Sequence, residues 1–493
     1  MYWLPLLSAL PFTAAVSGID AWLRYAPIPN AESLQGSVPG RVVALNESSE
    51  SPVYTAGQEL AQGISGILGK DVEIGDGAGA PQPYGSERKR GRGSGRPGRP
   101  GRPGHGGGGH GPGQGSGTIT VGTVDQFADA SIDVDAEGDL EDDGYHIIIA
   151  GSDVHIVGSN QRGALYGAFK YLNALAQGNA ITESYTSNPS APIRWVNQWD
   201  NLQDGGTHGS VERGYGGESI FYWNGSVRED LSRVPQYARL LASIGVNAAI
   251  VNNVNANESM VEPRIMEGLK RVADLMRPYG VQIGVALNFA TPQLLGVLDT
   301  FDPLDESVIG FWNERTNMFY EYIPDLVGYL IKASSEGQPG PLTYNRTLAD
   351  GANLFADPLL EHGGICMFRA FVYDYTTLNE TLDWRADRAN AAVEFFEGLD
   401  GAFDDNVVIQ SKSKIWKALI KHGTRTSTDN SGVQLSMAQS TFKSVSQLLR
   451  SSLTSRTLKK RSSFRSRRNT SVNRTILSTS RTYGKASSTS TCE

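Results

Sequence analysis

One stretch decides the fold: the apolar run Asp325-Leu326-Val327-Gly328-Tyr329-Leu330-Ile331, followed directly by Lys332-Ala333-Ser334-Ser335-Glu336-Gly337-Gln338-Pro339-Gly340-Pro341. The apolar run predicts a buried strand of a parallel sheet, because such strands read as continuous hydrophobic segments. It ends abruptly in a lysine and a glutamate. Functional groups of barrel enzymes gather at the carboxyl ends of the strands, so Lys332 and Glu336 are candidate site residues. The alternative is a solvated loop carboxylate near a surface lysine.

The same pattern of an apolar run followed by an amphipathic helix repeats along residues 189–410. This alternation predicts an α/β domain with a parallel sheet and crossover helices. Six strands are expected, so the sequence predicts an incomplete (β/α)8 barrel, since a closed one needs eight. The strands are expected near 194–199, 246–252, 281–287, 326–332, 364–372 and 407–410, and the helices near 229–243, 262–279, 313–323, 349–362 and 387–398.

Residues 18–188 predict a separate α+β domain upstream of the barrel. Thr118 to Val124 and Tyr145 to Val157 alternate in the manner of strands. Apolar residues recur at helical spacing further on, which predicts one amphipathic helix covering a sheet face. These are Leu165, Phe169, Leu172 and Leu175.

The first residues suggest secretion. Residues 1–17 hold an apolar stretch with a small-residue ending, typical of a signal peptide; the alternative is a short core strand. We therefore expect a secreted, extracellular protein. No other stretch approaches the roughly 18–20 apolar residues of a membrane span, so we expect no membrane partner. A disulfide framework is excluded, because Cys366 and Cys492 are the only cysteines. Sequons that fit a glycoprotein lie at Asn46, Asn224, Asn257, Asn345 and Asn379.

Two segments differ from everything around them. Residues 82–117 are rich in Gly, Arg and Pro, with 7 basic residues against 1 acidic, and residues 411–493 form a Ser/Thr-rich tail with 17 against 2. Both have too little apolar surface to fold, so we expect disorder. The remaining chain carries 20 basic and 49 acidic residues, which argues against a nucleic-acid partner. His105 and His110 lie in the glycine-rich segment, which cannot preorganise a metal site.

Longer motifs indicate a family. They are Arg194-Trp195-Val196-Asn197-Gln198-Trp199-Asp200-Asn201, the stretch from Gly245-Val246-Asn247 to Val254-Asn255-Ala256, and the stretch from Gly363-Gly364 to Phe368-Arg369-Ala370-Phe371-Val372-Tyr373-Asp374. Together with residues 330–341, they resemble the family 67 α-glucuronidases, above all the secreted fungal members. The resemblance covers most of residues 18–80 and 118–410. It implies a non-catalytic N-terminal domain and a barrel that needs neither cofactor nor metal. It also implies inverting hydrolysis of the α-1,2 link between (4-O-methyl)-D-glucuronic acid and xylose in xylan-derived aldouronic acids.

The resemblance also implies a role for each candidate residue. Glu336 matches the general acid, which gives its proton to the leaving oxygen. Lys332 and Arg369 match residues that hold the uronic acid, and a guanidinium can bind a carboxylate through two hydrogen bonds. Trp199 matches the aromatic residue that packs on the sugar, and Val254 lies similarly after the second strand. Arg369 as a structural ion pair and Trp199 as ordinary core remain alternatives, and Asn253 and Asn255 are further candidates for the rim.

The chain departs from the family after Gln410. The family's water-activating Asp and Glu belong to motifs that follow the sixth strand, resembling Gly-Pro-Ile-Asp-Phe-Gln-Val-Arg-Glu-Pro and Thr-Gln-Glu-Tyr, and neither occurs in residues 411–493. Only Lys412 falls where the family has another substrate lysine. The helical C-terminal domain that forms the family's dimer also has no counterpart. The abrupt change at Gln410 is typical of a frameshift or a mistaken exon, and we expect the chain as printed to be inactive.

Two other functions are consistent with the sequence. One is a non-catalytic carbohydrate-binding barrel protein that uses the acidic barrel mouth. The other is a basic-tailed interaction protein, in which residues 82–117 and 411–493 are the working parts. Restoration of the missing carboxylate motifs in the transcript would remove the reason for either.

Overall fold

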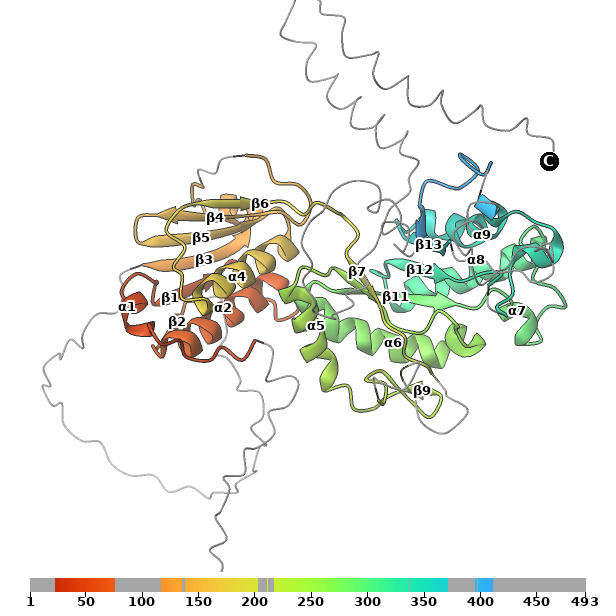
Figure 1. The fold of residues 1–493 in the computed structure, drawn as a ribbon, viewed down its shortest axis with the longest axis horizontal. Coiled ribbons are helices and arrows are strands. Elements are labelled where there is room, and N and C mark those ends of the chain that lie inside the picture. The colour runs from red at the N-terminus through yellow and green to blue at the C-terminus, as the bar shows by residue number, and fades with distance from the viewer. Residues whose placement is uncertain are drawn as a thin grey trace, which may run out of the picture. The chain divides into compact units, whose positions relative to one another are not determined.

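The computed structural model describes residues 23–75, 117–134, 138–202, 211, 217–335, 337–370, 395–396 and 398–410 (Figure 1). They all fall in one of the chain's two compact units, Met1–Thr441. The predictions for residues 1–17, for nearly all of 82–117 and for 411–493 therefore lie outside the described residues. So does most of the helix expected at 387–398.

The first sheet has six strands in the order β2-β1-β3-β5-β4-β6 (Figure 1). β4 runs antiparallel to both of its neighbours, whereas the other pairs are parallel. The single alternating run expected at 145–157 is two strands, because Gly151, at a φ of 67°, turns the chain between them. The strands are β1 Arg41–Ala44, β2 Glu73–Ile74, β3 Thr118–Thr123, β4 Tyr145–Ala150, β5 Asp153–Gly158 and β6 Tyr185–Ser187.

Two long helices, α2 Pro52–Leu68 and α4 Gln161–Ala176, pack side by side on one face of this sheet (Figure 1). α4 confirms the predicted amphipathic helix, whereas α2 was not predicted. Its ends are nonetheless encoded locally: the Ser51 hydroxyl caps the first turn by accepting from the Val53 N–H, and Gly69 ends the helix at a φ of 64°. The short helices α1 Ala31–Gln35 and α3 Val124–Asp129 complete this part, with Phe127 of α3 buried in a small separate cluster.

The second sheet is parallel throughout, in the order β14-β13-β12-β11-β10-β7 (Figure 1). All six predicted strands are confirmed, with most of them shorter than expected. A hairpin, β8 Tyr222–Trp223 with β9 Ser226–Val227, lies between β7 and β10 along the chain. The six strands are β7 Trp195–Asn197, β10 Ala248–Ile250, β11 Gln282–Leu287, β12 Gly328–Ile331, β13 Ile365–Arg369 and β14 Val407–Gln410.

This parallel sheet is curled into a half-barrel. The Arg369 guanidinium, at the end of β13, lies 6.0 Å from the ring centre of Trp199, just beyond β7. Three strands separate β13 from β7, so in a flat sheet the two strands would be roughly 19 Å apart at about 4.8 Å per step. The curl therefore points the ends of distant strands into one concave face.

Helices between the strands cover the convex face. α8 begins at Glu306 rather than at the expected Asn313, because Asp305 caps it by accepting from the Ser307 N–H and Val308 and Phe311 add core contacts. No helix within the described ranges is both long and apolar enough to cross a membrane. The described helices of this part, including short ones in the loops at the strand ends, are α5 Arg233–Ser243, η1 Glu258–Val261, α6 Pro263–Met276, η2 Arg277–Tyr279, α7 Thr291–Leu294, α8 Glu306–Tyr322, η3 Pro341–Tyr344 and α9 Leu348–Leu360.

Alternation along the strands divides the core into two clusters. Val285, Tyr329 and Cys366 belong to the large cluster that includes the helices. The residues next to them in sequence, Ala286, Leu330 and Met367, join Ile250 in a separate cluster on the concave face, here called the inner-face cluster. Successive side chains of a strand point to opposite sides, which produces this division.

A group of buried charges connects the first sheet to the start of the second. Asp143, only 2% exposed, lies just before β4 and accepts from Arg162 Nε at 2.8 Å and from Arg194 Nη2 at 2.7 Å. Arg194 directly precedes β7, and its backbone N–H donates to Asn247 Oδ1, just before β10. Burial alone would raise the pKa of Asp143, but the Arg162 charge and the hydrogen bonds from Arg162, Arg194 and Asn160 outweigh it and lower the pKa.

We predict that Asp143→Asn lowers the free energy of unfolding by about 3–5 kcal/mol at pH 7, because it leaves two arginines without their buried partner. A depressed folded pKa contributes stability that is complete above the unfolded value, about 3.9, and is lost as pH falls through the folded value. The difference between the native and variant proteins should therefore shrink below about pH 4. Urea unfolding at pH 7 and pH 3 measures both effects.

Asp274→Asn is the matched control, because Asp274 pairs with Lys270 and Arg277 while 42% of its side chain stays exposed. It should cost at most about 1 kcal/mol. Equal losses for the two variants would contradict the role given to Asp143.

Candidate functional site at the carboxyl ends of the parallel strands

The concave face changes from apolar to polar where the strands end. Two residues beyond Ile250, Ala286, Leu330 and Met367 of the inner-face cluster come Asn252, Asn288, Lys332 and Arg369. Alternate residues of a strand share a face, so these four polar side chains follow the cluster on the concave side. The carboxyl ends of β10, β11, β12 and β13 therefore form a polar rim, where ligands of parallel α/β proteins bind.

Lys332 lies at the end of β12 and is only 4% exposed. Its Nζ donates to Asn255 Oδ1 at 2.9 Å. Asn255 belongs to the loop after β10, two strands away in the sheet. A buried ammonium is stable only when it is hydrogen-bonded, so the Asn255 amide stabilises the Lys332 side chain in this position.

Arg369 lies beside Lys332 on the next strand. The pairing of Ile331 with Phe368 makes Lys332 and Arg369 neighbours at the following step. Arg369 is 5% exposed, and its guanidinium faces the Trp199 ring, the side chain that attracts cations best. The rim thus carries two cationic side chains on neighbouring strands.

Trp199 and Val254 lie on the apolar side of the same rim. Trp199 is half-buried and packs on the inner-face cluster, of which Val254, 2% exposed, is a member. The structure thus brings four predicted residues to one end of the half-barrel: Lys332, Arg369, Trp199 and Val254. Their contacts with a sugar stay a prediction.

Glu336, the predicted general acid, lies outside the described residues, between Ser335 and Gly337 of a tight turn. Ser335 and Gln338 exchange backbone hydrogen bonds, from the Ser335 N–H at 3.3 Å and from the Gln338 N–H at 2.9 Å. Gly337 has a φ of 80°, and Ser334 has a φ of 47°, which a residue with a side chain rarely adopts. Such strained residues cluster at functional sites, which fits a site at the end of β12.

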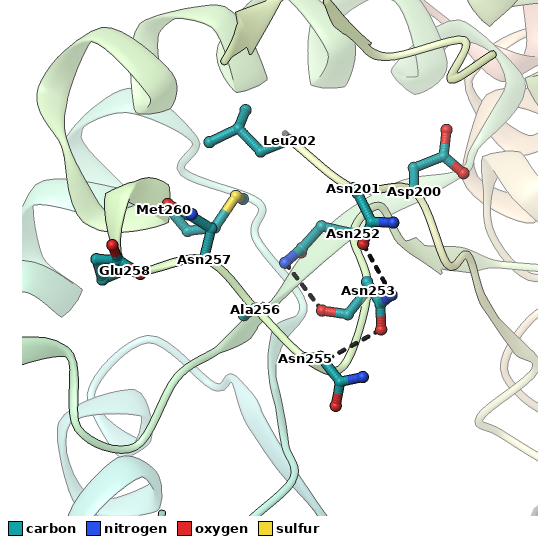
Figure 2. A pocket seen from close by; sticks show the side chains of 10 residues that line it. All are labelled: Asp200, Asn201, Leu202, Asn252, Asn253, Asn255, Ala256, Asn257, Glu258 and Met260. Carbon is teal, nitrogen blue, oxygen red and sulfur yellow. Dashed lines mark hydrogen bonds between the residues drawn. The ribbon is translucent and has the colours of Figure 1, made fainter. Parts of the chain in front are cut away.

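A polar pocket of about 170 Å³ opens between the loops after β7 and β10 (Figure 2). Asparagines dominate its lining and are hydrogen-bonded to one another: Asn253 Nδ2 donates to Asn201 Oδ1 at 2.8 Å, and Asn253 Oδ1 accepts from the Asn255 N–H at 3.0 Å. Sequence reasoning named Asn253 and Asn255 but missed Asn201, although four asparagines within 252–257 signal an amide-rich loop. The lining residues are Asp200, Asn201, Leu202, Asn252, Asn253, Asn255, Ala256, Asn257, Glu258 and Met260.

Asp200, at the wall of this pocket, stabilises the two loops that form it. Its carboxylate is fully buried, accepts from Ser219 Oγ at 2.5 Å and points away from the asparagines (Figure 2). Its backbone oxygen accepts from the Asn253 N–H at 2.8 Å, which ties the two loops together. Burial raises the pKa of Asp200, although hydrogen bonds from Ser219 and Gln198 oppose the shift.

A metal site is a separate question. In the part of the chain that the structure describes, no group of three His, Cys, Asp or Glu side chains is arranged to hold a metal ion.

Two family models match the chain. The glycosyl hydrolase family 67 middle domain matches residues 174–416, and the glycosyl hydrolase family 67 N-terminus matches residues 21–80 and 110–171. The curled sheet and its rim thus fall within the match to the middle domain.

Individual relatives are also similar. Alpha-glucuronidase A of Emericella nidulans is 58% identical over 414 residues, covering 83% of this chain and 45% of the relative. Alpha-glucuronidase of Hypocrea jecorina is 52% identical, and probable alpha-glucuronidase A of Neosartorya fischeri is 49% identical, each over 83% of this chain and 44% of the relative. The chain spans a little under half the length of the curated relatives it matches.

We predict that Arg369→Lys weakens the binding of D-glucuronate roughly tenfold, because a point charge replaces a planar donor that can bind a carboxylate through two hydrogen bonds. An NMR titration of the full chain measures the dissociation constant. Arg346→Lys is the control, since Arg346 also binds a carboxylate, that of Asp302, but lies outside the rim. Unchanged affinity in Arg369→Lys would remove Arg369 from the site.

Proposed function

Because the chain belongs to glycosyl hydrolase family 67, we propose that residues 189–410 form the uronic-acid-binding part of an α-glucuronidase. The reaction is inverting hydrolysis of the α-1,2 link between (4-O-methyl)-D-glucuronic acid and xylose in xylan-derived oligosaccharides. One observation carries the proposal: Lys332 and Arg369 stand side by side at the strand ends, with Trp199 beneath the guanidinium.

This arrangement suits a sugar that bears a carboxylate. Two neighbouring cations favour an anionic group, and hydrogen bonds from a charged donor to a carboxylate are about twice as strong as neutral ones. An indole face and the Val254 side chain offer apolar surface for the sugar ring and its methyl group. The relatives are α-glucuronidases by name, which favours hydrolysis over sugar binding without catalysis.

Glu336 is the proposed general acid. Its place in the sequence, four residues after Lys332, puts it just past the end of β12. Protonation of the leaving oxygen near neutral pH requires a carboxyl whose pKa is raised by its surroundings. Inversion requires a second carboxylate about 6.5–9.5 Å away to activate water, and the family's motifs for it have no counterpart in residues 411–493.

The proposal includes the larger organisation of the chain. Residues 18–188 are a non-catalytic accessory domain, and residues 189–410 supply six strands of a (β/α)8 catalytic barrel. The match to the family leaves residues 81–109 uncovered, which supports an insertion in the accessory domain. Residues 1–17 are a signal peptide, and the protein is secreted, which suits an enzyme whose polymeric substrate lies outside the cell.

We predict that the printed chain binds D-glucuronate but releases no methylglucuronic acid from aldotriouronic acid. A chimera whose residues after Gln410 come from the Emericella nidulans relative should release it, because that segment supplies the base that activates water. Chromatography of the released sugar measures both. Comparable turnover by the two proteins would show that the replaced segment is dispensable.

We predict that Glu336→Gln in this chimera lowers the rate on aldotriouronic acid by about 10²–10⁴-fold, the usual contribution of a general acid. An aryl glucuronide should lose much less, because its leaving group departs without protonation. Glu267→Gln, the same change at an exposed position of α6, is the control and should keep the native rate. Equal losses on both substrates would exclude Glu336 as the acid.

A further inference from the structure

We propose that Asn255 is a positioning residue for Lys332, and that its neutral amide fixes the ammonium without cancelling its charge. Asn255 thereby determines the preference of the site for an acidic sugar over a neutral one. The inference rests on the proposed function, since it takes Lys332 as part of the site for the sugar carboxylate.

The contact itself is short and crosses the sheet. Lys332 Nζ donates to Asn255 Oδ1 at 2.9 Å, from β12 to the loop after β10. A lysine side chain is a flexible four-carbon stem, so its ammonium has no fixed position of its own. An acceptor held by the neighbouring loop gives it one.

Asn255 is itself held by a chain of amides, visible in Figure 2. Its backbone N–H donates to Asn253 Oδ1 at 3.0 Å, and Asn253 Nδ2 donates to Asn201 Oδ1 at 2.8 Å. The Asn253 side chain is buried, and Asn201 comes two residues after Trp199. The amides therefore connect the loop that carries Trp199 to the ammonium of Lys332.

The uncharged state of Asn255 is the important feature. A carboxylate at this position would also hold the ammonium, but it would neutralise the lysine and repel the carboxylate of the sugar. An amide oxygen accepts the same hydrogen bond without adding charge. With Arg369 at the neighbouring step, the rim then places two cationic side chains where a uronic acid differs from a neutral hexose.

Asn255→Asp in the full chain tests this directly. D-Glucuronate and D-glucose are the probes, because they differ only in the carboxylate at C6. We expect the native chain to prefer D-glucuronate and the variant to bind it about tenfold more weakly or worse, with no change for D-glucose. NMR titrations give the dissociation constants, and thermal unfolding checks that the fold is retained.

Asn173→Asp is the matched control. Asn173 is exposed on α4, outside the candidate site, and its Oδ1 accepts from Gln177 Nε2, a hydrogen bond that aspartate accepts equally well. It adds the same charge away from the rim, so its affinity for D-glucuronate should stay within about threefold of native.

Asn255→Leu, a neutral variant of similar shape without the acceptor, keeps the test decisive if Asn255→Asp unfolds. It should lower the preference for D-glucuronate by releasing the ammonium. An unchanged preference in either Asn255 variant, or an equal loss in Asn173→Asp, overturns the positioning role and leaves the proposed function intact. A native chain that does not prefer D-glucuronate to D-glucose overturns both.

Discussion

The curl of the parallel sheet is the constraint on which the site depends. Lys332 and Arg369 are neighbours through strand pairing alone. Trp199 and Asn255 belong to the loops after β7 and β10, strands that lie two or more steps from β12 and β13 in the sheet. A flat sheet would hold them out of reach, since each step adds about 4.8 Å. Because the strands curl around the inner-face cluster, the Arg369 guanidinium meets the Trp199 ring and the Lys332 ammonium meets the Asn255 amide. Packing of small and medium apolar side chains on the concave face thus determines the distances between polar groups above it.

The buried charges around Asp143 lie at the starts of β7 and β10, opposite the ends of these strands that form the rim. Arg194 and Asn247 precede β7 and β10, and Trp199 and Asn252 follow them. Both strands are only three residues long, so the buried charges and the rim lie a few residues apart along the same two segments. Asp143 therefore contributes to holding the starts of the two strands whose ends carry Trp199 and Asn252.

The sequence predicted what depends on local pattern. Apolar runs predicted all six parallel strands. The two runs that end at Lys332 and Arg369 placed both cations at the rim. Two missed features carry local signals in the sequence. α2 has caps at Ser51 and Gly69 and buried apolar residues at helical spacing, and α8 starts early because of the Asp305 cap. The Asn255 contact was missed because it depends on the curl, which is a property of the whole sheet.

Under the proposed function, the distribution of charge on the rim would also orient a bound sugar. The polar side chains are neutral amides just after β10 and β11, Asn252 and Asn288, and cations at the ends of β12 and β13. The Asn252 amide is used within the protein, since it pairs with the backbone N–H and oxygen of Ala286. A uronic acid would therefore direct its carboxylate toward β12 and β13 and its ring toward Trp199. Glu336 follows β12 in the sequence, so the residues that bind the carboxylate and the residue proposed to protonate the leaving oxygen come from one segment. Under the proposed function, recognition of the acidic group by Lys332 and placement of the acid would thus be coupled through the end of β12.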